Sequence, residues 1–241
     1  MMEKVFRSRG IRLLHNRDDS ICEQQKIYYE PIDCKIDNRQ IRYWMDENLL
    51  SLFEYSEVNG RVDTYNLHVK LEHEMHNIIY LGMDDQQLAM LGVIPTVFDI
   101  SFKNYTVGYQ IDNKEISRSA YYYYPTIWKE DHYGIKGIED TTIITDEISR
   151  FADYVAVDKQ SKLEIEYFGS IMYKLKGVSI HFRKDFSSYK LYGRCNQIGL
   201  QKLLADNMNV NIEKYDYGEV VLVAQRIQCG RVTGYNLYFT K

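Results

Sequence analysis

An alternating pattern of apolar and polar residues, broken at intervals by turns, recurs from residue 51 to the C-terminus and constrains the fold more than any other feature. Two alternating runs joined by a short turn are typical of a β-hairpin with one buried face. The turn Asn59-Gly60 is the strongest of these hairpin signals. The pattern predicts five hairpins, over 52–58 and 64–72, 96–102 and 105–111, 154–157 and 162–168, 178–183 and 189–194, and 220–227 and 233–240.

The second runs of these hairpins resemble one another: YNLHVKL, YTVGYQI, KLEIEYF, YKLYGRC and YNLYFTK. Self-similarity along a chain indicates a repeat architecture. Helical patterns fall between the runs at 73–91, 113–124, 142–153 and 196–207, the last with Asn196 as its N-cap, and Ile171–Lys176 reads as a further strand. The stretch Gly169–Gly177 is too short for a helix pair. Residues 1–50 are predicted to be a mixed segment of loop and helix (3–14 and 44–52), and residues 51–241 a repeat-built domain.

Each predicted hairpin has one apolar face and one face that carries charges of both signs, because successive side chains of a strand point to opposite sides. Two arrangements fit this alternation. One is an open antiparallel sheet with its polar face in water. The other is an α+β fold with an antiparallel barrel of about ten strands, helices packed outside and the polar face inside. A lumen lined by Lys, Arg, Glu and Tyr would suit an anionic ligand.

Composition excludes several classes of protein. The chain has 241 residues, with 34 acidic and 30 basic side chains and a formal net charge of −4, which argues against a nucleic-acid binder. An uncharged apolar run long enough to span a membrane is missing. The four cysteines stand apart without a CxxC pair, which favours a reduced, cytoplasmic protein. There are 22 tyrosines, a residue that favours strands and lines ligand pockets.

Short motifs typical of other chemistry are incomplete or absent in this chain. His73-Glu74-Met75-His76 is one residue shorter than the zinc-binding HExxH pattern, so no protein-held metal is expected there. The sequence has neither a GxGxxG nor a GxxxxGK[ST] motif, so no organic cofactor is expected. Glu164-Ile-Glu166 is similar to part of the ExExK strand of triphosphate-tunnel enzymes, which offers a metal-dependent phosphohydrolase as an alternative function. A non-enzymatic β-rich binding or structural protein is the third reading, with Tyr121–Tyr124 as a partner surface.

Four segments, in a shared order, carry a family resemblance. They are Ser51-Leu-Phe-Glu54-Tyr-Ser56, Val97-Phe-Asp99-Ile-Ser, Val178–Arg183 followed by Tyr189–Tyr192, and Val223-Ala-Gln-Arg226 followed by Tyr235–Phe239. These segments resemble strand motifs of the ABBA-type prenyltransferases, and among them the cyanobactin peptide prenyltransferases. The resemblance implies a ten-stranded antiparallel barrel with its active site in the lumen.

The resemblance also implies a reaction and a set of residues. A prenyl group would pass from an allylic diphosphate such as dimethylallyl diphosphate to an aromatic or peptide side-chain acceptor, with Mg²⁺ on the diphosphate. Glu54 would be the catalytic carboxylate that takes a proton from the acceptor. The diphosphate would contact Lys70, Lys103, Arg183, Lys190 and Arg194. The tyrosines that shield the allylic cation would be Tyr109, Tyr167, Tyr192 and Tyr238.

Overall fold

The computed structural model of the chain describes residues 4–16, 20–31, 50–58, 61–70, 97–99, 102–112, 115–182 and 187–239. Ten long strands dominate this part of the chain. They are β1 (Lys4–His15), β2 (Ile21–Pro31), β3 (Leu50–Val58), β4 (Arg61–Lys70), β5 (Phe102–Asp112), β6 (Glu115–Pro125), β9 (Met172–Phe182), β10 (Ser187–Cys195), β11 (Val220–Gln228) and β12 (Arg231–Phe239). They pair antiparallel in one closed ring, in the order β1-β12-β11-β10-β9-β6-β5-β4-β3-β2. Consecutive hairpins therefore stand side by side around the ring.

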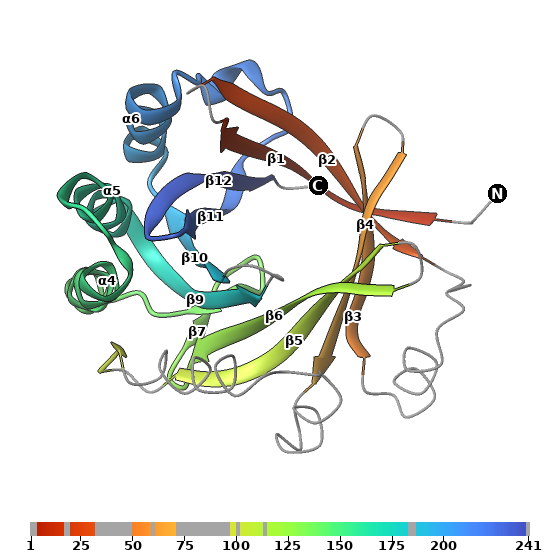
Figure 1. Cartoon of the computed structure of the whole chain (residues 1–241), viewed down its shortest axis with the longest axis horizontal. Coiled ribbons are helices and arrows are strands. Elements are labelled where there is room, and N and C mark those ends of the chain that lie inside the picture. The colour runs from red at the N-terminus through yellow and green to blue at the C-terminus, as the bar shows by residue number, and fades with distance from the viewer. Residues whose placement is uncertain are drawn as a thin grey trace.

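Helices lie outside this ring along β9 to β12 (Figure 1). They are α4 (Thr141–Val155), α5 (Lys159–Ser170), α6 (Gln197–Met208) and the short 3₁₀ helix η1 (Ile212–Lys214). Asp140, Asp158 and Asn196 cap the three α-helices, each accepting backbone N–H groups of the first turn through its side-chain oxygen. A small hairpin of β7 (Lys129–Glu130) and β8 (Lys136–Gly137) precedes α4.

The hydrophobic core fills the space between these helices and the outer face of the strands. α4 contributes a stripe at helical spacing that includes Ile144, Ile148 and Phe151. Facing strands contribute every second residue, for example Leu191 of β10 and Leu237 of β12, which are both fully buried. Because strand side chains alternate, the residues between these core positions point into the ring.

The predicted class, a large antiparallel sheet with α-helices beside it, agrees with the structure. The helix predictions at 142–153 and 196–207 are confirmed by α4 and α6, and the strand prediction at Ile171–Lys176 by β9. The predicted hairpins at 52–72, 178–194 and 220–240 correspond to β3-β4, β9-β10 and β11-β12.

Three predictions were wrong. Residues 154–168 are not a hairpin but the end of α4 followed by α5. These two helices form a helix pair directly before β9, where the stretch Gly169–Gly177 was too short to hold one. Residues 113–124 are not a helix but β6, which takes the place predicted for 96–102 as the partner of β5. Residues 3–14 are not a helix but β1, which pairs with both β2 and β12, so the N-terminal segment is part of the ring. The predicted helix at 73–91 lies outside the described residues, as does most of the one at 44–52.

Candidate functional site: the inner wall of the strand ring

On β1, β2 and β9 to β12, the structure describes the side chains of residues 9–16, 20–27, 172–182, 188–195 and 220–239, and the charged ones that point into the ring are basic. Arg12 lies between the core residues Ile11 and Leu13, and Lys190 lies between Tyr189 and Leu191, which face the helices. Alternation therefore turns both cations inward. They include Arg12, Lys26, Lys174, Lys190, Arg194 and Arg226.

Strand register joins two of these cations, Lys190 and Arg226, and the position of Lys70 into one row of paired positions. Lys70 of β4 pairs with Thr106, Thr106 with Tyr122, and Tyr122 with Ser179. Ser179 pairs in turn with Lys190, and Lys190 with Arg226. The row crosses six strands, so it brings together positions that are distant in sequence. Lys190 and Arg226 are both half-buried.

A neighbouring group on β1, β2 and β12 extends this basic surface. Arg12 donates from Nη1 to Gln24 Oε1 at 3.2 Å, and Lys26 is only 3% exposed. Asn236, opposite Arg12 in the register, directs its Nδ2 to the hydroxyl of Tyr238 at 3.5 Å. The Nε of Arg12 and the Oδ1 of Asn236 are buried without a hydrogen-bond partner. Cations gathered on one inner face favour an anionic ligand in the ring.

Tyrosines lie beside the cations. Tyr192 and Tyr238, both predicted for the lumen, occupy inward positions of β10 and β12, where Tyr192 is buried and Tyr238 half-buried. The ring of Tyr192 lies 6.1 Å from that of Tyr122, measured between centroids. Burial raises the pKa of the Tyr192 phenol well above its usual value, so the hydroxyl stays protonated and can donate.

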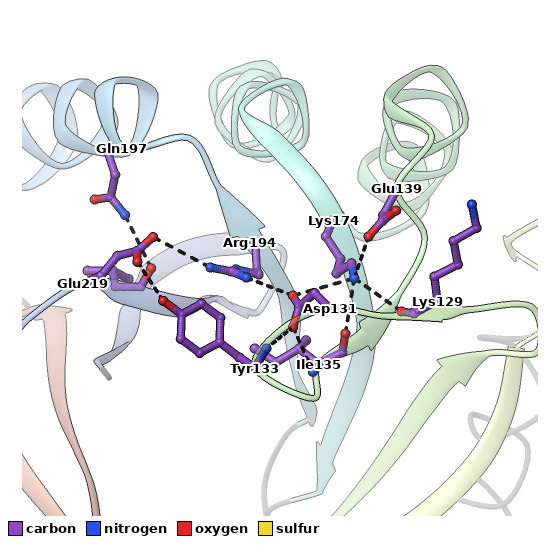
Figure 2. A network of polar contacts seen from close by, with 10 residues as sticks. Lys129, Asp131, Tyr133, Ile135, Glu139, Lys174, Arg194, Gln197 and Glu219 are labelled. Atoms are coloured by element: carbon purple, nitrogen blue, oxygen red, sulfur yellow. Dashed lines mark hydrogen bonds and ion pairs between the residues drawn. The ribbon is translucent and has the colours of Figure 1, made fainter. Parts of the chain in front are cut away.

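Arg194, predicted to bind diphosphate, is held in a network of carboxylates (Figure 2). It is 3% exposed, and its Nη1 lies 2.9 Å from Oδ2 of Asp131, in the turn between β7 and β8. Glu219 lies 3.8 Å from the other end of the guanidinium, and the ring of Tyr133 stacks against it with 4.6 Å from Cζ to the ring centroid. Arg194 therefore fastens the β7-β8 turn to the end of β10.

Lys174 has the same function on β9, directly opposite Arg194 in the register. This side chain is 1% exposed, and its Nζ lies 2.8 Å from Oε1 of Glu139 and 3.6 Å from Oδ2 of Asp131. Nζ also donates to the backbone carbonyls of Lys129 and Ile135, both at 3.3 Å. The β7-β8 segment thus covers two buried cations at one end of the inner wall (Figure 2).

Asp131 is the acceptor at the centre of this network. Burial by itself raises the pKa of its carboxyl, but the hydrogen bonds from Arg194 and from the backbone N–H groups of Ile135 and Tyr133, with the charge of Lys174, outweigh it and lower the pKa overall. The carboxylate is therefore ionised at neutral pH. Sequence reasoning identified Arg194 as a site residue but missed Asp131. Asp131 lies 63 positions before Arg194 and 43 positions before Lys174 in the sequence (194 − 131 and 174 − 131), so no local pattern links them.

The other predicted residues are placed as follows. Glu54 of β3 is opposite Asn66 in the register, and Lys103 of β5 is opposite Tyr124. Tyr109 of β5 stands in the row Leu67–Tyr109–Ser119–Phe182, which is not the row of Lys190 and ends at a core residue. The side chains of Glu54, Lys70, Lys103 and Tyr109 lie outside the described part of the chain, as does the whole of Arg183.

Two predictions on residues 162–168 were wrong because this segment is helical. Tyr167 lies on α5, outside the ring, and packs against the core, so it does not line the inner wall. Glu164 and Glu166 do not alternate on a strand: Glu164 accepts a hydrogen bond from the Tyr235 hydroxyl at 2.7 Å, and Glu166 accepts one from Ser149 at 2.7 Å. The strand motif that suggested a triphosphate-tunnel enzyme is therefore absent from residues 159–170.

The contact between Glu164 and Tyr235 gives a testable pH dependence. Burial raises the pKa of the Glu164 carboxyl, although the hydrogen bond from Tyr235 opposes the shift. Since the folded pKa lies above the unfolded one, the native state binds the proton more tightly, and ionisation of Glu164 lowers stability as pH rises through this range. We expect Glu164→Gln, whose amide oxygen still accepts from Tyr235, to gain stability relative to wild type between pH 4 and pH 7.5. Urea unfolding at a series of pH values measures this, and parallel curves would contradict it.

Sequence reasoning missed the cations Arg12 and Lys26. Both lie on strands that were predicted to be helix or loop. The signal was weak because Leu14, at the next inward position after Arg12, is apolar and interrupts the alternation of apolar and polar residues. The core residues Ile11 and Leu13 on either side of Arg12 would have been the clue, since they alternate with it.

Two further findings concern metal and membrane. Among the residues that the structure describes, no group of three or more His, Cys, Asp or Glu side chains gathers where it could hold a metal ion. None of the helices in that part of the chain is both long and apolar enough to cross a membrane.

Comparison with protein-family models found no match, and comparison with curated proteins found none either. Among solved structures, the chain is similar to 6-dimethylallyltryptophan synthase from Micromonospora olivasterospora, crystallised in complex with DMASPP and Trp. The identity is 11%, the alignment covers 97% of this chain and 81% of that chain, and the TM-score is 0.46. The function proposed below rests on the residues of this chain.

Proposed function

We propose that this chain transfers a prenyl group from an allylic diphosphate, such as dimethylallyl diphosphate, to an aromatic molecule or a peptide side chain. The observation that supports the proposal most strongly is the inner wall, where Arg12, Lys26, Lys190 and Arg226 lie among inward-facing tyrosines. Cations neutralise a departing diphosphate, and tyrosine rings suit an allylic cation. The motif resemblance to ABBA-type prenyltransferases, including the cyanobactin enzymes that modify peptides, agrees with this choice.

Different residues of this chain would assist the successive steps of the reaction. The C–O bond of the allylic diphosphate breaks, and both bonding electrons leave with the diphosphate oxygen. Lys190 and Arg226, neighbours in the register, would stabilise the negative charge that develops there. The electron pair of the acceptor then forms the new bond to the allylic carbon. Glu54 remains our proposal for the carboxylate that takes the proton released by the acceptor.

Mg²⁺ would enter bound to the diphosphate. Magnesium prefers carboxylate, phosphate and water oxygens, whereas the inward-pointing charged side chains of residues 9–16, 20–27, 172–182, 188–195 and 220–239 are basic. That part of the wall does not fit a protein-held magnesium site. Its basic side chains are suited instead to bind the phosphate oxygens that Mg²⁺ does not coordinate.

The proposal is tested by incubating the protein with dimethylallyl diphosphate, Mg²⁺ and either tryptophan or peptides that contain Trp and Tyr. Mass spectrometry is expected to detect a prenylated acceptor. We expect Lys190→Ala to lower transfer by about 30-fold, on the order of 2 kcal/mol of transition-state stabilisation. The stability change should stay below about 1 kcal/mol, because Tyr189 and Leu191 carry the packing on the other face of β10.

Lys202→Ala is the matched control, because Lys202 is an exposed lysine on α6, outside the ring. Transfer by this variant should equal that of wild type. A wild-type protein that binds neither dimethylallyl diphosphate nor pyrophosphate would refute the proposed function. A wild-type protein that binds both but prenylates nothing would point to a binding protein instead.

A further inference from the structure

Three side chains on the inner faces of β9 and β10 form a chain of hydrogen bonds. Nε2 of His181 lies 2.7 Å from Oγ of Ser179, and Oγ of Ser179 donates to the hydroxyl oxygen of Tyr192 at 3.2 Å. Ser179 is fully buried and Tyr192 nearly so. The ring of Tyr122 packs edge-on against His181, with 6.1 Å between centroids, and at 6.1 Å from Tyr192.

The direction of this chain follows from the number of hydrogens. A serine hydroxyl has one hydrogen, and Ser179 gives it to Tyr192. The contact between Ser179 and His181 must then be donated by the imidazole, so Nε2 carries a hydrogen. Because the Tyr192 oxygen accepts from Ser179, its own hydrogen is directed elsewhere. Tyr192 stands on an inward position, so that hydrogen is available to a group inside the ring.

The position of the chain connects it to the basic row. Ser179 pairs directly with Lys190 across β9 and β10, and Lys190 pairs with Arg226. Any phosphate oxygen held by these two cations therefore lies next to the strand positions of Ser179 and Tyr192. A phenolic O–H is a good donor to a phosphate oxygen, and its orientation decides whether it can donate.

We propose that His181 and Ser179 are positioning residues that aim the hydroxyl of Tyr192 at a diphosphate held by Lys190 and Arg226. This inference rests on the proposed function. His181 holds the Ser179 hydroxyl through the hydrogen on Nε2, so that Ser179 donates to Tyr192.

Pyrophosphate affinity, measured by calorimetry, tests the proposal. We expect Ser179→Ala and Tyr192→Phe each to weaken binding about tenfold. The double variant should bind no more weakly than Tyr192→Phe alone, because Ser179 acts through Tyr192. Additive losses, or wild-type affinity in Ser179→Ala, would overturn the proposal.

The role of His181 has its own measurement. Gln places an amide nitrogen near the position of Nε2, so His181→Gln should keep most of the wild-type affinity for pyrophosphate, whereas His181→Ala should weaken binding about as much as Ser179→Ala. Wild-type affinity in His181→Ala would contradict the positioning role of His181.

Controls separate this inference from the proposed function. Ser188→Ala removes another buried serine, on β10 opposite His181, and should leave the affinity unchanged. If Lys190→Ala also binds pyrophosphate like wild type, the diphosphate site itself is wrong and the inference falls with it. If Lys190→Ala weakens binding while Ser179→Ala does not, only the positioning role is wrong.

A ligand-free measurement covers the case in which Ser179→Ala does not fold. Nitrogen-15 chemical shifts of the wild-type protein report the tautomer of neutral His181. We expect the Nε2–H form, which the contact to Ser179 requires. Finding the Nδ1–H form would reverse the direction of the chain and overturn the proposal.

Discussion

Replacing Asp131 by Asn is expected to destabilise the protein by about 4 kcal/mol at neutral pH. Asp131 is the carboxylate shared by two buried cations, Arg194 and Lys174, and removing one partner of a buried ion pair is strongly destabilising. The remaining partners, Glu219 at 3.8 Å from Arg194 and Glu139 at 2.8 Å from Lys174, are both about half exposed and compensate only in part. Because the folded pKa of Asp131 lies below its unfolded value, its stabilising contribution is complete above the unfolded pKa and is lost as pH falls toward the folded one. The difference between variant and wild type should therefore shrink in acid. Urea unfolding at neutral and acid pH measures both effects.

Glu139→Gln is the control for this network. Glu139 contacts the same Lys174 ammonium at 2.8 Å, but its side chain is about half exposed, so water can replace it. The loss of stability should be much smaller than for Asp131→Asn. Equal losses in the two variants would mean that Lys174 alone, rather than the Asp131 bridge between two strands, holds the β7-β8 segment.

Replacing Gly234 by Ala is expected to cost about 3–4 kcal/mol, because it forces apart the strands that close the ring. Gly234 of β12 pairs with Leu14 of β1 and has a φ of +150°. A Cβ atom there would lie 2.0 Å from the carbonyl oxygen of Leu13, much closer than atoms can approach. The backbone oxygen cannot move without disturbing the β1-β12 pairing, so steric overlap adds to the conformational strain. Thermal unfolding measures the loss.

Gly134→Ala separates these two causes. Gly134 also has a positive φ, +71°, but a Cβ atom there meets only the side-chain tip of Glu130 at 3.2 Å. The flexible glutamate can move, so the cost should be limited to the left-handed backbone, about 1 kcal/mol. Similar losses at both glycines would argue against a close approach at the β1-β12 seam. Pyrophosphate binding should also fall in Gly234→Ala, since β1 carries Arg12.

Local sequence patterns were sufficient to predict an element and the direction of its side chains where helix and strand signals did not compete. The second half of the chain shows this for α6, where Asn196 accepts from the backbone N–H of Gly199 at 2.6 Å as an N-cap should. In β10, Leu191 faces the core while Lys190 and Tyr192 face inward, as the alternation predicted. These features depend on neighbours a few residues apart, which a sequence pattern can report.

Residues 159–170 show where two local patterns competed. Leu163, Ile165 and Tyr167 alternate like a strand, but Ile165 and Phe168 are the residues buried in the core, at helical spacing, and Leu163 is 50% exposed. The Asp158 N-cap favours the helix, and the contact of Glu164 with Tyr235 of β12 fixes which side faces the ring. A single alternating run cannot tell these cases apart, because a short helix can show period two by coincidence.

By itself the sequence determined the β9-β10 and β11-β12 hairpins, their outward apolar face and the inward positions of Lys190, Tyr192 and Tyr238. Only the tertiary structure decided the closure of the ring, since Gly10 meets Tyr238 across the β1-β12 seam. It also decided the fate of Arg194, which looked like Lys190 in the alternation but is neutralised by Asp131, 63 positions earlier. The physical reason is the same in both cases: hydrogen bonds and ion pairs between distant segments form only after the chain has brought them together, and no local pattern encodes which partner a strand edge or a buried charge will meet.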